Sequence, residues 1–189
     1  MTAVRVVGID PSLTSTGIAR LTHEAGWAPQ TFTDTVGHPG TDNLPLLQRA
    51  RRILDAAVEV VSLVPGGTDL VVIEQPAYGS TTGDPHDRAG LWWEIVTRLV
   101  ALGVQVVEVN PSHLKMWATG RGNAAKPAVV QRVVAQWGEY FTLPTGKGRN
   151  DVADAVALAT LGAAHLGHHL ADLPDEHTRA LGRVAWPVP

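Results

Sequence analysis

The chain has 189 residues, of which 44% are hydrophobic and 17% charged, and this favours a single domain with a proper hydrophobic core. It contains no cysteine, which excludes disulfide scaffolding, thiol catalysis and cysteine-ligated zinc. No apolar run approaches the roughly 20 residues that span a bilayer, and the N-terminus lacks a signal-peptide pattern, so we expect a cytoplasmic protein. The net charge of −3 gives no overall sign of nucleic-acid or membrane binding.

Basic residues are nevertheless concentrated in one part of the chain. Between residues 110 and 150 the only acidic residue is Glu139, whereas six residues are basic. They are Lys115, Arg121, Lys126, Arg132, Lys147 and Arg149. Such a concentration is typical of proteins that bind the phosphate backbone of nucleic acids, although charge alone is also consistent with a solvated surface.

The first predicted element is a β-hairpin around a carboxylate. The β-branched residues between Val4 and Ile9 are typical of a buried strand, and this run ends at Asp10. Turn-forming residues follow, and Gly17 lets the returning backbone pass close to a neighbouring segment. A carboxylate at such a strand end is held rigidly, as a metal ligand or a general base must be.

Strands and helices alternate along the rest of the chain. We expect strands over 30–36, 69–74 and 104–109, a loop over 77–88, a short helix beginning at 110–112, and helices over 44–64, 88–102, 126–137 and 151–165. This order predicts an α/β domain with a mixed sheet, in which right-handed crossovers make the later strands parallel to the first. We assign this domain to residues 1–167 and expect residues 168–189 to form a loosely held C-terminal tail.

Acidic residues from three parts of the chain are expected to meet at one edge of this sheet. Asp10 and Glu74 each end a predicted strand. Because these strands are parallel, both carboxylates fall at the edge where ligand sites of such sheets lie. Asp151 and Asp154 are three residues apart, so they share one face of the last helix.

The sequence of that last helix allows it to approach the sheet closely. Asn150 is a candidate N-cap residue. Small side chains follow at alternate positions, namely Ala153, Ala155, Ala157 and Ala159.

Four carboxylates around one point need a counter-charge, because their mutual repulsion otherwise forces protonation or unfolding. Hard oxygen ligands without histidine or cysteine favour Mg²⁺ or Mn²⁺. Two such ions about 4 Å apart can activate a water and stabilise the leaving oxygen of a phosphodiester. Each acid alone also has an ordinary interpretation as a turn, strand-end or helix-capping residue, and only their combination favours a metal site.

Three segments resemble the acidic motifs of the RuvC family of Holliday-junction resolvases, which have an RNase H-like fold. They are residues 8–17 (GIDPSLTSTG), 73–75 (IEQ) and 151–159 (DVADAVALA), and between them residues 111–115 and 119–126 resemble the family's lysine-bearing segments. The resemblance runs from residue 4 to about 166. It implies a mixed five-stranded sheet flanked by helices, Mg²⁺ as the cofactor with Mn²⁺ as a substitute, and a homodimer that acts on branched DNA.

The resemblance also implies roles for individual residues. The positions that match the family's catalytic, metal-binding acids are Asp10, Glu74, Asp151 and Asp154.

Four further residues are assigned to nucleic-acid binding. Lys115 and Lys126 match residues that contact phosphates near the scissile bond, although both can also be ordinary surface lysines. Arg121 lies in the same basic segment. Tyr78, in the loop after Glu74, is suited to stacking on an unpaired base, or simply to packing against its loop.

The sequence departs from the pattern of the bacterial enzymes in two places, as in a divergent phage-type or actinobacterial-type member. The position three residues past Glu74 is Ala77 rather than an aromatic residue, and the next helix carries Trp92 and Trp93 instead of small residues. These tryptophans lie on adjacent faces, so they cannot both be buried in one core. One is expected at a subunit contact or beneath the C-terminal tail.

A second, weaker candidate for a metal site lies at the end of the last helix. It consists of His165, His168 and His169, and no acidic motif accompanies them.

The sequence therefore predicts a Mg²⁺-dependent, structure-selective endonuclease, a crossover junction endodeoxyribonuclease that cuts Holliday junctions or other branched DNA. Two other functions stay open at this point. One is a non-catalytic module that binds junctions. The other is an actin-like phosphotransferase, because residues 8–17 faintly resemble a phosphate-binding hairpin.

Overall fold

The computed structural model describes residues 3–38, 44–76 and 84–187. Its five strands form one mixed sheet in the order β3-β2-β1-β4-β5. They are β1 (Val4–Asp10), β2 (Thr16–His23), β3 (Gln30–Val36), β4 (Leu70–Glu74) and β5 (Val106–Val109). The first three strands are antiparallel neighbours, whereas β4 pairs in parallel with both β1 and β5. The predicted mixed five-stranded sheet is confirmed, with β3 at its edge.

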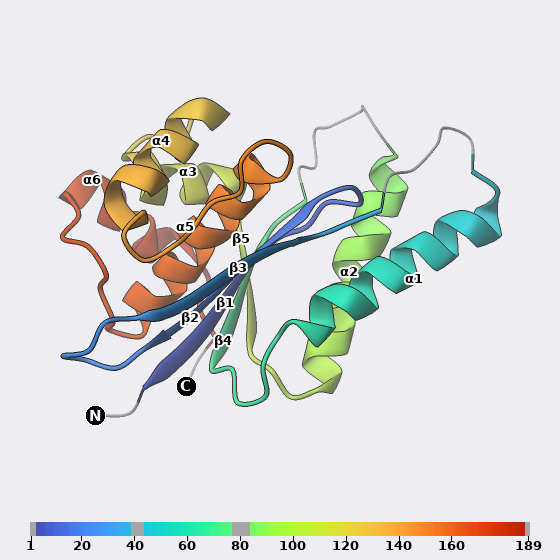
Figure 1. Cartoon of the computed structure of the whole chain (residues 1–189), viewed down its shortest axis with the longest axis horizontal. Helices are drawn as coiled ribbons and strands as arrows, with labels where there is room; N and C mark the ends of the chain where they lie inside the picture. Colours follow the sequence, from blue (N-terminus) through green and yellow to red (C-terminus); the bar gives the residue numbers. More distant parts are fainter. Residues whose placement is uncertain (1–2, 39–43, 77–83, 188–189) are drawn as a thin grey trace.

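Helices cover both faces of the sheet (Figure 1). One face packs against α1 (Leu46–Ser62) and α2 (Pro85–Ala101). The other face packs against α3 (Pro111–Thr119), α4 (Lys126–Trp137) and α5 (Arg149–His165). The chain then forms the short helices α6 (Asp175–Thr178) and η1 (Leu181–Arg183). None of the helices in the described ranges is long and apolar enough to cross a membrane.

Helix α5 lies directly on the sheet, with every residue from Val152 to Ala164 buried. A Cβ atom built on Gly8 of β1 would lie 2.0 Å from the backbone oxygen of Ala155, and one on Gly17 of β2 would lie 2.0 Å from that of Asp151. Real Cβ atoms essentially never make contacts under 3.0 Å. The two glycines therefore let the backbones of helix and sheet touch, and the close approach predicted from the alanine-rich sequence is confirmed.

Two helices begin earlier than the sequence patterns predict. Helix α2 starts at Pro85 instead of about residue 88, because proline suits the first turn, where its missing N–H has no partner to lose. Helix α5 starts at Arg149, so Asn150 lies inside the helix and is not its cap. Gly148 takes the N-cap position with a φ of 83°, a left-handed conformation that glycine adopts without strain.

The expectation of a loosely held tail is wrong for residues 168–187. Ala180 is fully buried, and the Nδ1 atom of the buried His177 lies 2.8 Å from the carbonyl oxygen of Trp117 in α3. Trp186 stacks on His165 of α5 with ring centroids 4.0 Å apart. The segment folds back onto the α3 and α5 layer and completes its core.

Candidate active site

Strand alternation sends two of the predicted acids to the same face of the sheet. In β1, Val6 contributes to the core under α5, and Asp10 lies an even number of residues further on. In β4, Val72 belongs to the same core, and Glu74 follows two residues later. Because Ile9 pairs with Ile73, Asp10 and Glu74 end adjacent strands side by side.

The other two acids, Asp151 and Asp154, reach this point from helix α5, which packs on that face of the sheet. Helix α5 begins beside the ends of β1 and β2, where the backbone of Asp151 lies against Gly17, the residue paired with Asp10. Asp154, one turn into the helix, is only 9% exposed, and Asp10 is 7% exposed. The four acids thus converge as the sequence predicts.

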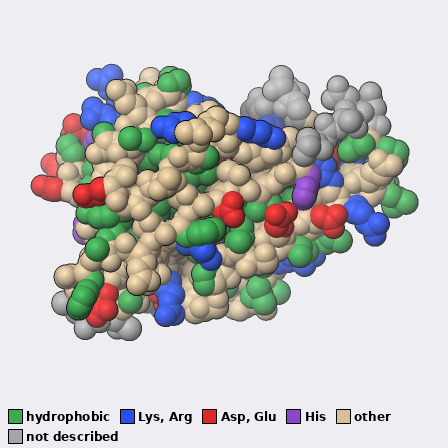
Figure 2. All heavy atoms as spheres, viewed as in Figure 1, with side chains coloured by type: hydrophobic (Ala, Val, Ile, Leu, Met, Phe, Trp, Pro, Cys, Tyr) green, Lys and Arg blue, Asp and Glu red, His purple; other side chains and the backbone are tan. Residues whose placement is uncertain are grey.

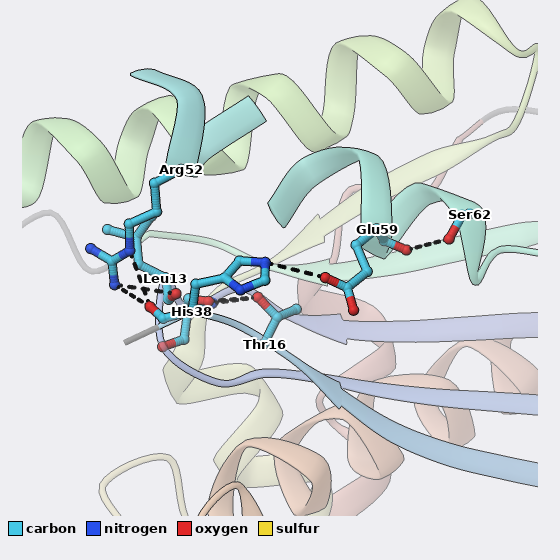
Figure 3. Close-up of polar contacts among 7 residues, drawn as sticks. Leu13, Thr16, His38, Arg52, Glu59 and Ser62 are labelled. Carbon is cyan, nitrogen blue, oxygen red and sulfur yellow. Dashed lines mark hydrogen bonds and ion pairs between the residues drawn. The ribbon is translucent and has the colours of Figure 1, made fainter. Parts of the chain in front are cut away.

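The turn that follows Asp10 is held from two sides. Inside the hairpin, the Thr16 hydroxyl accepts a hydrogen bond from the backbone N–H of Ser12 and donates to the Ser12 carbonyl. From α1, the Arg52 guanidinium donates to the carbonyl oxygens of Leu13 and His38 (Figure 3). This network fixes the turn in place, and with it the position of Asp10.

The acids line a cleft of about 370 Å³. Lys115 of α3 and Lys126 at the start of α4 lie in its wall, so both lysines predicted to contact phosphates are at the acidic site. The cleft is lined by Asp10, Pro11, Ser12, Glu74, Gln75, Pro76, Pro85, Arg88, Trp92, Pro111, Leu114, Lys115, Lys126, Val129, Asp151 and Asp154.

Burial and mutual repulsion perturb the acids strongly. Burial raises the pKa of Asp10 well above its ordinary value, and the charge of Glu74 raises it further. Burial, followed by repulsion from Glu74, raises the pKa of Asp154 to about 7. Burial also raises the pKa of Glu74, although a hydrogen bond from Asp10 and the charges of Lys126 and Lys115 oppose the rise.

The raised pKa values show that the carboxylates cannot all carry a negative charge at this site without a cation to balance them. The direct interaction of Asp10 with Glu74 favours the protonated form of Asp10 and so adds to the rise in its pKa. Among the described residues, no three acidic or histidine side chains are gathered closely enough to form a ready-made cage for one ion. Oxygen donors whose protons can be displaced nevertheless match the chemistry that hard divalent cations require.

The structure does not place every predicted site residue in this cleft. Arg121 is exposed and lines a separate cleft between α4 and the C-terminal segment, together with Arg132 and Glu176. Tyr78 and Ala77 lie outside the described residues.

Two of the three C-terminal histidines contact different partners. His165 stacks on Trp186. His168 lies against His23 of β2, with the two Nδ1 atoms 3.3 Å apart.

Sequence reasoning missed several residues that line the cleft. Gln75 accepts a hydrogen bond from the Asn110 side chain, which also caps α3 by accepting from the N–H of Ser112. Two sequence features could have indicated this contact: Asn110-Pro111 is a typical helix start, and Gln75 directly follows the predicted strand that ends at Glu74. Arg88 and Trp92 reach the cleft from α2, and no local pattern indicates that this helix turns them toward the acids.

The two adjacent tryptophans of α2 have different surroundings. Trp92 is 8% exposed and Trp93 is 60% exposed, which confirms that they are not buried together and shows that the C-terminal segment does not cover Trp93. Further exposed apolar residues, Leu46 and Leu47, lie at the start of α1. Figure 2 shows hydrophobic side chains on the surface at this end of the molecule.

The architecture as a whole is an RNase H-like fold: a mixed five-stranded sheet, helices on both faces, and acids at the end of the central strands. A family model described as crossover junction endodeoxyribonuclease RuvC matches residues 6–162. The chain therefore belongs to the RuvC family.

Individual relatives and structures agree with this assignment. A crossover junction endodeoxyribonuclease RuvC of Methylobacterium radiotolerans is 30% identical over 186 residues, which cover 94% of this chain and 83% of the relative. The Thermus thermophilus RuvC structure shares the fold with a TM-score of 0.62 at 24% identity, covering 87% of this chain and 97% of that one. A structure of T. thermophilus RuvC in complex with Holliday junction substrate also has a TM-score of 0.62, at 22% identity over 87% of this chain and 96% of that one.

Proposed function

We propose that this protein is a divalent-metal-dependent endonuclease that cleaves Holliday junctions or other branched DNA, with its nuclease site carried by residues 1–167. The observation that carries the proposal is the convergence of four carboxylates and two lysines, from separate strands and helices, on one cleft. Membership of the RuvC family supports the same reaction, since its relatives bear the name crossover junction endodeoxyribonuclease.

The acids are suited to holding divalent metal ions. Asp10, Glu74, Asp151 and Asp154 offer only oxygen donors, which favours Mg²⁺ with Mn²⁺ as a substitute. When bound, a pair of such ions would supply an activated water and stabilisation of the leaving oxygen in phosphodiester hydrolysis. Burial of these carboxylates makes their interaction with a cation stronger than it would be in water.

The lysine side chains of the cleft are suited to binding the phosphates of the DNA. Lys115 and Lys126 face the acids closely enough to lower the pKa of Glu74, so their ammonium groups border the place where a phosphate must lie. There they neutralise phosphate charge and stabilise the charge that develops during the reaction. Arg121 lies outside the cleft and would contact the DNA backbone farther from the scissile bond.

The substrate and the assembly follow from the symmetry of a junction. A four-way junction presents two equivalent strands for cleavage, so a two-fold homodimer would place one acidic cleft at each. The structure of T. thermophilus RuvC with Holliday junction substrate supports this choice of DNA. The exposed Trp93 and neighbouring apolar residues of α1 are candidates for the contact between subunits.

Cleavage of synthetic DNA tests the proposal. The protein is incubated with four-way junctions, flaps and linear duplexes in Mg²⁺, in parallel with Asp10→Asn and with Asp55→Asn, an exposed acid on α1. Wild type and Asp55→Asn should cut the branched substrates, whereas Asp10→Asn should be slower by about 10³-fold or more. No cutting by wild type, or equal cutting by Asp10→Asn, would refute the proposal; tight junction binding without cutting would identify a binding module instead.

A further inference from the structure

Trp92 joins α2 to the end of strand β4. Its indole Nε1–H donates a hydrogen bond to the backbone carbonyl oxygen of Glu74 over 2.9 Å. The ring is 8% exposed and lines the acidic cleft. Trp93, the next residue of the helix, packs edge-on against it with ring centroids 4.8 Å apart.

The backbone around Glu74 is held from other directions as well. Residue Ile73 pairs with Ile9 of β1, so the strand is fixed on that side up to the last residue before the acid. On the opposite side, the N–H of Gln75 donates to the carbonyl of Val109 in β5 over 2.8 Å. The bond from Trp92 holds the carbonyl oxygen of Glu74, which is the other end of this same Glu74–Gln75 peptide group, from outside the sheet.

Helix α2 is firmly anchored where it presents this tryptophan. Two guanidinium nitrogens of Arg49 in α1 donate to the two carboxylate oxygens of Asp87, at 2.8 and 2.5 Å. Asp87 is itself buried and lies in the first turn of α2. An anchored helix can hold Trp92, and through it Glu74, in a defined position.

We propose that Trp92 is a positioning residue that sets the direction in which the Glu74 carboxylate enters the cleft. Without the indole N–H, the part-buried carbonyl of Glu74 loses this partner, and the peptide group that follows Glu74 is held only by the bond from the Gln75 N–H to Val109, so it can tilt toward another donor. Rotation of that peptide moves the carboxylate relative to Asp10. Groups that orient metal ligands in this way affect metal affinity or activity by about 10- to 100-fold when they are removed. The inference rests on the proposed metal-dependent function of the cleft.

The test compares two substitutions that remove the same kind of bond. Trp92→Phe removes the bond to Glu74. The matched control, Trp186→Phe, removes an indole bond to the carbonyl of Leu181 (2.8 Å) in the C-terminal segment. Binding of Mn²⁺ alone is measured by isothermal titration calorimetry, thermal stability is measured in EDTA, and kcat and KM are measured on a synthetic four-way junction.

We expect both variants to lose some thermal stability, but only Trp92→Phe to bind Mn²⁺ about 10-fold or more weakly and to have a lower kcat with little change in KM. Equal Mn²⁺ affinity and kcat in wild type and Trp92→Phe would overturn the inference while leaving the nuclease proposal intact. Failure of wild type to bind Mn²⁺ or to cut DNA would overturn both.

If Trp92→Phe does not fold, 3-benzothienylalanine at position 92 keeps the shape of the ring and replaces only the N–H. The same loss of Mn²⁺ affinity is expected from this replacement. Wild-type affinity in the benzothienyl protein would show that the hydrogen bond does not position Glu74.

Discussion

Substitution of Gly17 by alanine should damage both the fold and the acidic site. Gly17 pairs with Asp10 in the hairpin, and a Cβ atom there would lie 2.0 Å from the backbone oxygen of Asp151 and 2.2 Å from its carbonyl carbon. Both opposing atoms belong to backbone, so no side chain can rotate away. The start of α5 must therefore move by about 1 Å or more from the sheet to restore ordinary contact.

The size of the effect follows from this displacement. Adding a methyl group to a well-packed core costs typically about 1–3 kcal/mol, and the rigid backbone contact at Gly17 places Gly17→Ala at the upper end. For a protein of this size that corresponds to a fall in Tm of about 6–12 °C. Because the shift also separates Asp151 from Asp10, cleavage should fall by about 10²-fold, the effect expected from a 1 Å misplacement.

Differential scanning calorimetry and single-turnover cleavage of a four-way junction in Mg²⁺ measure the two effects. Gly66→Ala is the control, since a Cβ at Gly66 meets no atom within 4 Å. It should leave the Tm within about 2 °C and the cleavage rate unchanged. A Gly17→Ala variant with wild-type Tm and wild-type cleavage would refute the close backbone contact and its link to the acids.

Three further predictions concern charge. Lys126→Met should slow cleavage by about 10²-fold, whereas Arg132→Met, on the same helix but outside the cleft, should leave the single-turnover rate near that of wild type. In EDTA, the Tm of Asp154→Asn should rise relative to wild type as the pH increases from about 4 to about 7, because folding holds a proton on Asp154 (pKa about 7) that the unfolded chain has lost; a difference that shrinks with pH would contradict this. Asp87→Asn should lower the Tm by about 2–6 °C at pH 7. The deficit should shrink as the pH falls below the ordinary aspartate pKa of about 3.9, because hydrogen bonds from Arg49 hold the pKa of Asp87 below that value in the folded protein; a deficit that does not depend on pH would exclude the ion pair as its cause.

Local patterns were sufficient for the elements that carry the acids. The β-branched run of β1, the short apolar run of β4 and the spacing in α5 each reflect a single element's own surroundings, and Asp10, Glu74, Asp151 and Asp154 converge because strand direction and helix periodicity are set locally. Helix α4 has the predicted bounds of 126–137, since Pro127 suits its first turn and Gly138 follows its end.

Features that depend on distant partners could not be predicted. The C-terminal segment is polar in sequence, and its packing depends on His177 meeting a carbonyl of α3 and Trp186 meeting the ring of His165. In the same way, nothing near Trp92 in sequence indicates that its indole reaches Glu74, 18 residues away. Such contacts form because of how whole helices and strands pack against one another, and the local sequence preferences for helix or strand do not predict them.

The close packing of α5 against Gly8 and Gly17 also affects how the protein folds during its synthesis. The helix that buries these strands leaves the ribosome roughly 140 residues after Asp10, about 7–30 s later at ordinary rates of translation. Until then, the nascent chain has a half-covered sheet and only two of its four acids. We therefore expect nuclease competence to arise late, in a single step when α5 docks, so that ribosome-bound fragments ending before Asp151 cannot cut the DNA around them.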